Sequence, residues 1–122
     1  MGDPPRILLV DDDRQIVRYL KKALTEGGYA VTATTSSKQA LALTQEGPPD
    51  LLILDLNMPE PDGFELLKIE RAKFPYMRIL AISGYSQGAL LEAAGILGAV
   101  ATLRKPVTAE ELVAKVREVI GR

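Results

Sequence analysis

Five short apolar segments, each followed by a stretch with helical spacing, constrain most strongly how this chain can fold. The third of them, LLIL at 51–54, runs without a break into Asp55. Strands that are apolar at every position, rather than at alternate positions, are typical of a sheet that is covered on both faces. Alternation of strands and helices with right-handed crossovers makes such strands parallel. The sequence therefore predicts an α/β fold with a parallel five-stranded sheet between two layers of helices.

The predicted elements follow from runs of apolar or β-branched residues and from apolar spacing of three and four. The predicted strands cover residues 7–10, 29–35, 51–54, 78–82 and 100–104. The predicted helices cover about residues 16–26, 36–46, 64–73, 86–97 and 108–120. Ser36 with Gln39, and Thr108 with Glu111, have the spacing of a capping box at a helix start. Asp13 is expected to cap the first helix.

The composition excludes several kinds of function. The 122 residues include 15 basic and 16 acidic side chains, so no excess of positive charge favours nucleic acid as a partner. The chain has no cysteine and no histidine, which removes disulfides, the usual zinc ligands and histidine-based catalytic triads. No apolar run approaches the roughly 20 residues that cross a membrane, and the start of the chain lacks the pattern of a signal peptide. We therefore expect one cytoplasmic domain over residues 1–122, with an ordered core at about 6–121.

Polar residues end the predicted strands, which is where the ligand site of an open parallel sheet lies. Asp11 and Asp12 follow the first strand, Asp55 the third, Ser83 the fourth and Lys105 the fifth. Two unit charges about 4 Å apart repel by about 4 kcal/mol at an effective dielectric constant near 20, so three carboxylates require a cation. Mg²⁺ suits a site with few carboxylates, because it keeps waters that an incoming phosphate can replace. The residues predict a Mg²⁺ site with Asp55 as the exposed tip of a buried strand.

The chain resembles the receiver domain of two-component response regulators. The resemblance rests on four motifs in order, LLVDDD at 8–13, LLILDLNMPEPDG at 51–63, AISG at 81–84 and LRKP at 103–106. It implies a doubly wound, flavodoxin-like fold with strand order 2-1-3-4-5 and five helices. It also explains the missing histidine, because the phosphoryl donor brings its own.

The resemblance gives each matching residue an expected role. Asp55 matches the residue that accepts a phosphoryl group from the phosphohistidine of a sensor histidine kinase or phosphotransfer protein. Asp12 and Asp55 match direct ligands of Mg²⁺. Asp11 is expected to act largely through water, and the backbone carbonyl of Asn57 is expected to supply a further metal ligand.

Further positions match the parts that respond to phosphorylation. Ser83 matches the hydroxyl that turns inward to the phosphoryl oxygen, and Lys105 matches the amine that pairs with it, before a Pro106 whose peptide bond is usually cis. Thr102 stands where the family usually has Tyr or Phe, so the aromatic part of the switch is missing. Tyr85 is expected near the mouth of the site, where its bulk would shield the acyl phosphate from water.

The implied function is a phosphorylation-controlled signalling module rather than an enzyme with a separate substrate. An output domain or downstream protein would contact the fourth helix, the fifth strand and the fifth helix, and the resemblance allows a phosphorylation-dependent dimer. Two alternatives stay open. A pseudo-receiver would bind partners without being phosphorylated. A Mg²⁺-dependent aspartyl phosphohydrolase would need an acid–base residue two positions after Asp55, where Asn57 cannot shuttle a proton.

Overall fold

The chain forms five strands that alternate with five helices, as the apolar segments predict. The structure is a computed structural model, and it describes residues 2–58, 63–84 and 88–121. The strands are β1 (Arg6–Val10), β2 (Ala30–Thr34), β3 (Leu51–Asp55), β4 (Arg78–Ser83) and β5 (Ala101–Arg104). The helices are α1 (Arg14–Glu26), α2 (Ser37–Glu46), α3 (Gly63–Lys73), α4 (Gly88–Ile96) and α5 (Ala109–Ile120).

All four strand pairings are parallel, and the strands lie in the order β2-β1-β3-β4-β5. This confirms the order that the resemblance implies. In register, Val10 pairs with Leu54, and Asp55 pairs with Ile82. The carboxyl ends of β1, β3 and β4 are therefore level, and the residues that follow them meet at one edge of the sheet.

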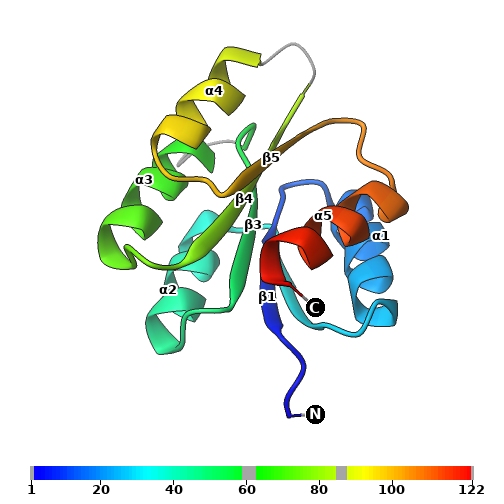
Figure 1. Cartoon of the computed structure of the whole chain (residues 1–122). Helices are drawn as coiled ribbons and strands as arrows, with labels where there is room; N and C mark the ends of the chain where they lie inside the picture. Colours follow the sequence, from blue (N-terminus) through cyan, green and yellow to red (C-terminus); the bar gives the residue numbers. More distant parts are fainter. Residues whose placement is uncertain (1, 59–62, 85–87, 122) are drawn as a thin grey trace.

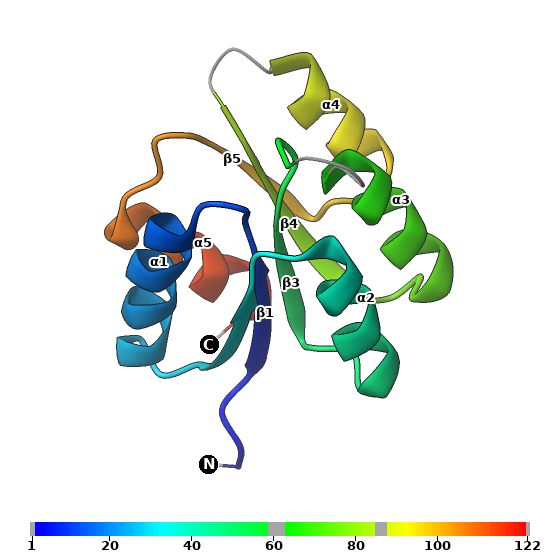
Figure 2. The same ribbon diagram turned by 180° about the vertical axis from the view of Figure 1, so that it is seen from behind.

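Helices cover both faces of the sheet (Figures 1 and 2). One core joins the sheet to α1 and α5, and a second core joins its other face to α2, α3 and α4. The central strand β3 contributes to both cores, since Leu51 and Ile53 lie in the first, and Leu52 and Leu54 in the second. These four side chains are fully buried, which fits a strand that is apolar at every position.

The two edge strands are shorter and more exposed than predicted. β2 begins at Ala30 and ends at Thr34. β5 begins at Ala101, and the residue before it, Val100, lies outside the strand and is 52% exposed. An edge strand has a neighbour on one side only, so its side chains are partly open to solvent. The predicted fourth helix is observed as α4 over Gly88–Ile96, and its predicted first residues lie outside the described part of the chain.

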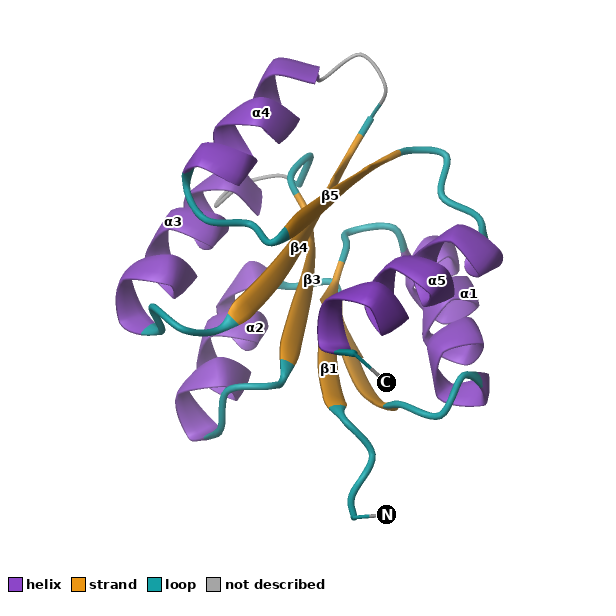
Figure 3. Cartoon of the chain, viewed as in Figure 1, coloured by secondary structure: helices purple, strands orange, loops and turns teal. Residues whose placement is uncertain are grey.

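Side chains cap three helices as the sequence predicts. The Asp13 carboxylate accepts hydrogen bonds from the backbone N–H groups of Gln15 and Ile16, at 2.9 and 3.2 Å. The hydroxyls of Ser36 and Thr108 each accept from an N–H group three residues on, at 3.2 and 3.1 Å. These caps begin each helix directly after a strand end, and Figure 3 shows the helices enclosing the sheet. None of the helices within 2–58, 63–84 and 88–121 is long and apolar enough to cross a membrane.

Candidate functional site

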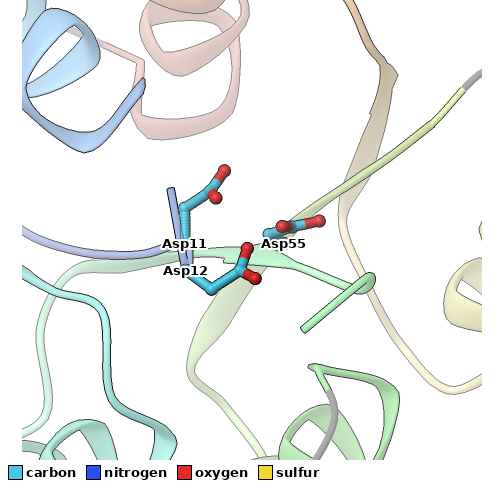
Figure 4. Close-up of side chains that lie close together, drawn as sticks. All are labelled: Asp11, Asp12 and Asp55. Atoms are coloured by element: carbon cyan, nitrogen blue, oxygen red, sulfur yellow. The ribbon is translucent and has the colours of Figure 1, made fainter. Parts of the chain in front are cut away.

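Three carboxylates meet at the carboxyl edge of the sheet. Asp11 and Asp12 follow β1, and Asp55 is the last residue of the neighbouring strand β3. One carboxylate oxygen from each lies within 4.8 Å of the others, and Figure 4 shows the three side chains close together. The level ends of β1 and β3 thus bring together the three acidic residues that the sequence places at strand ends.

The amine of Lys105 joins this cluster from the other side of β4. Its Nζ lies 3.2 Å from Oδ2 of Asp55 and 3.3 Å from Oδ2 of Asp11. The backbone N–H of Lys105 donates to the carbonyl of Ser83 at 2.7 Å, which holds the segment after β5 against β4. Burial alone would lower the pKa of Lys105, but the charges of Asp11 and Asp55 outweigh it and raise that pKa. The amine is therefore held in its charged form.

The prediction that Asp55 is an exposed tip is wrong, because its side chain is only 1% exposed. Its Oδ1 accepts from the backbone N–H of Asn57 at 3.0 Å, and its Oδ2 accepts from Lys105. A buried carboxylate is tolerated when it is paired and hydrogen-bonded, and both oxygens of Asp55 meet this condition. The sequence could not show this, because the amine lies 50 residues further along the chain.

The cluster has more negative charge than Lys105 can balance. Burial raises the pKa of Asp11 from its ordinary 3.8 to about 6, and the charge of Asp55 adds to this rise. A hydrogen bond from the backbone N–H of Asp13, at 3.0 Å, and the charge of Lys105 act in the opposite direction. Three carboxylates beside one amine make this edge of the sheet a place where a further cation would be stabilised.

The donor set fits Mg²⁺. Among the described residues, the candidate metal ligands that converge here are carboxylate oxygens, which hard divalent cations prefer. Asp12 is exposed, and its carboxylate has no hydrogen-bond partner among the described residues, so it can turn toward an ion. Asp11, Asp12 and Asp55 are the residues that would hold the metal. The role of the Asn57 backbone carbonyl as a further ligand stays a prediction.

Ser83 lies at the same edge but contacts Asn57 rather than a carboxylate. It is the last residue of β4 and is fully buried. Its Oγ lies 2.7 Å from Oδ1 of Asn57, and the backbone N–H of Gly84 lies 3.0 Å from the same oxygen. The Asn57 side chain therefore links the loop after β3 to the end of β4.

Gly63 supports the site in a way that the sequence analysis missed. A Cβ atom at this position would lie 1.8 Å from the carbonyl oxygen of Asp55 and 2.6 Å from Cα of Leu56. Helix α3 therefore begins directly against the backbone of Asp55, and only glycine allows this approach. The motif at 51–63 ends in PEPDG, and prolines followed by glycine are typical of a turn, but a turn alone does not require so close a contact.

Three further expectations concern Pro106, Thr102 and Tyr85. The Lys105–Pro106 peptide bond is cis, as the resemblance implies. Thr102 is half-buried on β5 and lines a surface hollow of about 390 Å³ with Leu91, Glu92 and Arg104, so no aromatic ring fills this position. Tyr85, expected near the mouth of the site, lies outside the described residues.

Comparison with known proteins gives the family. The family model described as "Response regulator receiver domain" matches residues 7–117. The chain is 34% identical over 119 residues to the response regulator MprA of Mycolicibacterium vanbaalenii, covering 98% of this chain and 52% of that protein. It is 35% identical to the response regulator receiver protein CpdR of Brucella abortus, covering 94% of this chain and 96% of that protein. The chain thus spans about half the length of the first of these relatives and nearly all of the second.

Solved structures agree with this result. A CheY-like response regulator receiver domain protein from Methanospirillum hungatei has a TM-score of 0.91 and 29% identity, over 98% of this chain and 95% of that chain. A putative response regulator from Chloroflexus aurantiacus has a TM-score of 0.90 and 31% identity, over 98% of this chain and 100% of that chain. With the strand order 2-1-3-4-5 and the acidic cluster at the carboxyl edge, these matches show that the chain belongs to the receiver-domain family of two-component response regulators.

Proposed function

We propose that Asp55 accepts a phosphoryl group from a phosphohistidine on a partner kinase or phosphotransfer protein. The observation that carries this proposal is the position of Lys105, whose amine lies 3.2 Å from Asp55. Lys105 follows β5, which lies on the other side of β3 from β1, the strand that precedes Asp11 and Asp12. Phosphoryl transfer needs an aligned nucleophile and charge neutralisation more than it needs acid–base chemistry. A carboxylate that contacts an amine and lies beside two further carboxylates that could hold a metal ion meets both needs.

In the proposed step, a carboxylate oxygen of Asp55 forms a bond to phosphorus while the bond from phosphorus to the histidine nitrogen breaks. The electron pair of that bond leaves with the imidazole. Mg²⁺ bound by the acidic cluster would neutralise charge on the phosphoryl oxygens. The N–H of Asn57 fixes the rotation of the Asp55 carboxylate, and Lys105 stabilises the negative charge that the transfer brings into the site.

The domain then acts as a cytoplasmic switch rather than as an enzyme with its own substrate. Phosphorylation shifts an equilibrium between two conformations, and a partner or output domain reads the change on the face formed by α4, β5 and α5. Dimerisation of the phosphorylated form through this face belongs to the same proposal. The proposal includes no nucleic acid or membrane as a direct partner of this domain.

Covalent labelling by acetyl phosphate with Mg²⁺ tests the proposal. The wild-type chain should gain one phosphoryl group that survives mass analysis, and Asp55→Asn should gain none. The Asp3→Asn variant, which changes an exposed carboxylate at the start of the chain, serves as the matched control and should label normally. Rapid release of many equivalents of phosphate would favour a phosphohydrolase instead, and no labelling would favour a pseudo-receiver.

A further inference from the structure

Two hydrogen-bond donors at the end of β4 converge on one oxygen atom. The Ser83 hydroxyl lies 2.7 Å from Oδ1 of Asn57, and the backbone N–H of Gly84 lies 3.0 Å from the same atom. Ser83 is fully buried, whereas Asn57 is exposed. We call these three residues the Asn57 latch.

The orientation of the Asn57 amide follows from Gly84. A backbone N–H can only donate, so the atom that faces it is the carbonyl oxygen of the amide rather than its amino group. That oxygen has no proton, so the Ser83 hydroxyl is the donor in the 2.7 Å contact. A hydroxyl group has one proton to donate, and in this structure the Ser83 hydroxyl uses it in the hydrogen bond to Asn57.

A serine held in this way cannot also donate to a phosphoryl oxygen on Asp55. We propose that the Asn57 latch holds Ser83 in the unphosphorylated protein and that phosphorylation of Asp55 moves the Ser83 hydroxyl from Asn57 to the phosphoryl group. The inference rests on the proposed function and on the role that the resemblance gives to Ser83, whose hydroxyl turns toward that group. Asn57 is then a positioning residue, acting through Ser83.

Asn57 also contacts the phosphoacceptor residue, Asp55. Its backbone N–H donates to Oδ1 of Asp55 at 3.0 Å, so one residue contacts both the phosphoacceptor and the serine. A hydrogen bond to a full carboxylate is stronger than one to a neutral ester oxygen. Phosphorylation turns the Asp55 carboxylate into an acyl phosphate, which weakens this bond and loosens Asn57 when Ser83 has to leave. Since Thr102 supplies no ring, the Asn57 latch rather than an aromatic side chain controls the Ser83 hydroxyl.

Beryllium fluoride, a non-covalent mimic of a phosphoryl group, provides the test at saturating Mg²⁺. Asn57→Ala should bind it about threefold to tenfold more tightly than wild type, which corresponds to one hydrogen bond that no longer has to be broken. In a Ser83→Ala background, the same Asn57→Ala change should have almost no effect, because no hydroxyl remains to be held. Gln45→Ala, which removes another side-chain amide remote from the site, is the control and should bind like wild type.

The outcomes separate the latch from the proposed function. Equal or weaker binding by Asn57→Ala, or the same gain with and without the Ser83 hydroxyl, would overturn the latch while leaving the proposed function standing. No binding by wild type would overturn the proposed function and the latch with it. Asn57 is exposed, so its truncation opens no cavity, and Asn57→Leu gives the same comparison with the side-chain volume kept.

Discussion

The Nζ atom of Lys105 lies 3.2 Å from Oδ2 of Asp55 and so joins the ends of β5 and β3 across the strand between them. The same amine lies 3.3 Å from Asp11, which is 2% exposed. One cation thus serves two buried carboxylates that come from different strands. This arrangement links the chemistry of the site to the stability of the fold.

Replacing Lys105 by Met removes the amine and keeps most of the side-chain volume. Asp11 and Asp55 then stay buried without their cation, so the free energy of unfolding without divalent ions should fall by on the order of 2 kcal/mol. Labelling by acetyl phosphate should slow at least about tenfold. Urea unfolding measures the first effect. Lys115→Met, which breaks a pair with exposed Glu118, is the matched control and should change stability by less than about 1 kcal/mol. Equal losses in the two variants would contradict this account.

Binding of Mg²⁺ should stabilise the native state, because three carboxylates crowd one edge of the sheet. At a concentration about ten times Kd, the melting temperature should rise by about 3–6 °C. Asp12→Asn should lose most of this rise, since it removes a ligand that has no other partner, whereas Asp3→Asn should keep it. Thermal melts with and without Mg²⁺ make the comparison, and an unchanged wild-type melting curve would argue against a metal site.

Adding one methyl group at Gly63 should displace the backbone of Asp55. A Cβ there would lie 1.8 Å from the carbonyl oxygen of Asp55, so Gly63→Ala should push α3 away from the end of β3 and cost about 1–3 kcal/mol or more. Gly95→Ala in α4 is the matched control. Its Cβ meets nothing within 4 Å, and alanine favours a helix, so this variant should be as stable as wild type or slightly more stable. Chemical denaturation of both variants decides between these outcomes.

Glu70 makes stability depend on pH. It is fully buried, and its Oε1 lies 2.9 Å from the Thr44 hydroxyl, which also lies 3.1 Å from the carbonyl of Leu41. That hydroxyl can donate only one proton, and Oε2 of Glu70 has no partner among the described residues. Protonation removes the negative charge from the buried carboxyl group, so an oxygen without a hydrogen-bond partner then costs less free energy of burial. Burial raises the pKa of Glu70, against the opposing effects of the Thr44 hydrogen bond and the charge of Lys73.

The sign of the pH effect follows from this shift. The folded state binds a proton more tightly than the unfolded state does, whose pKa is near 4.5. The stabilisation is therefore complete below that pH and is lost as the pH rises through the raised pKa of the folded state. Glu70→Gln should lack this loss, so its stability relative to wild type should increase with pH. Exposed Glu92→Gln should follow wild type throughout. Urea unfolding across the pH range checks the trend, and infrared absorption of a protonated carboxyl group, absent in Glu70→Gln, provides a second measurement.

The sequence predicted the positions of Asp11, Asp55 and Lys105 because strand ends are set by local patterns and parallel strands place those ends together. It did not predict the burial of Asp55, because the charge that compensates this carboxylate comes from Lys105 in a distant segment. The contact between Asn57 and Ser83 depends on the course of the loop after β3, which no periodicity encodes. The strand order came from the resemblance, since spacing alone does not fix which strands become neighbours.

The burial of Glu70 and the exposure of Val100 bear differently on what the sequence can predict. Leu66, Leu67 and Glu70 share the spacing of a buried helical stripe, so a carboxylate on that stripe was a signal of an unusual buried acid. The β-branched side chain of Val100 favours a strand, but Val100 is 52% exposed and lies outside the edge strand β5. Propensity describes the residue, whereas the edge position is a property of the whole sheet.

The alternation of β3 between two cores limits how this molecule can transmit a signal. Any shift of the strand that carries Asp55 would have to break close packing on both faces at once. The sheet therefore serves as a stationary base for the chemistry. If phosphorylation switches this domain as proposed, the change would reach a partner through the helices around the carboxyl edge rather than through movement of the sheet.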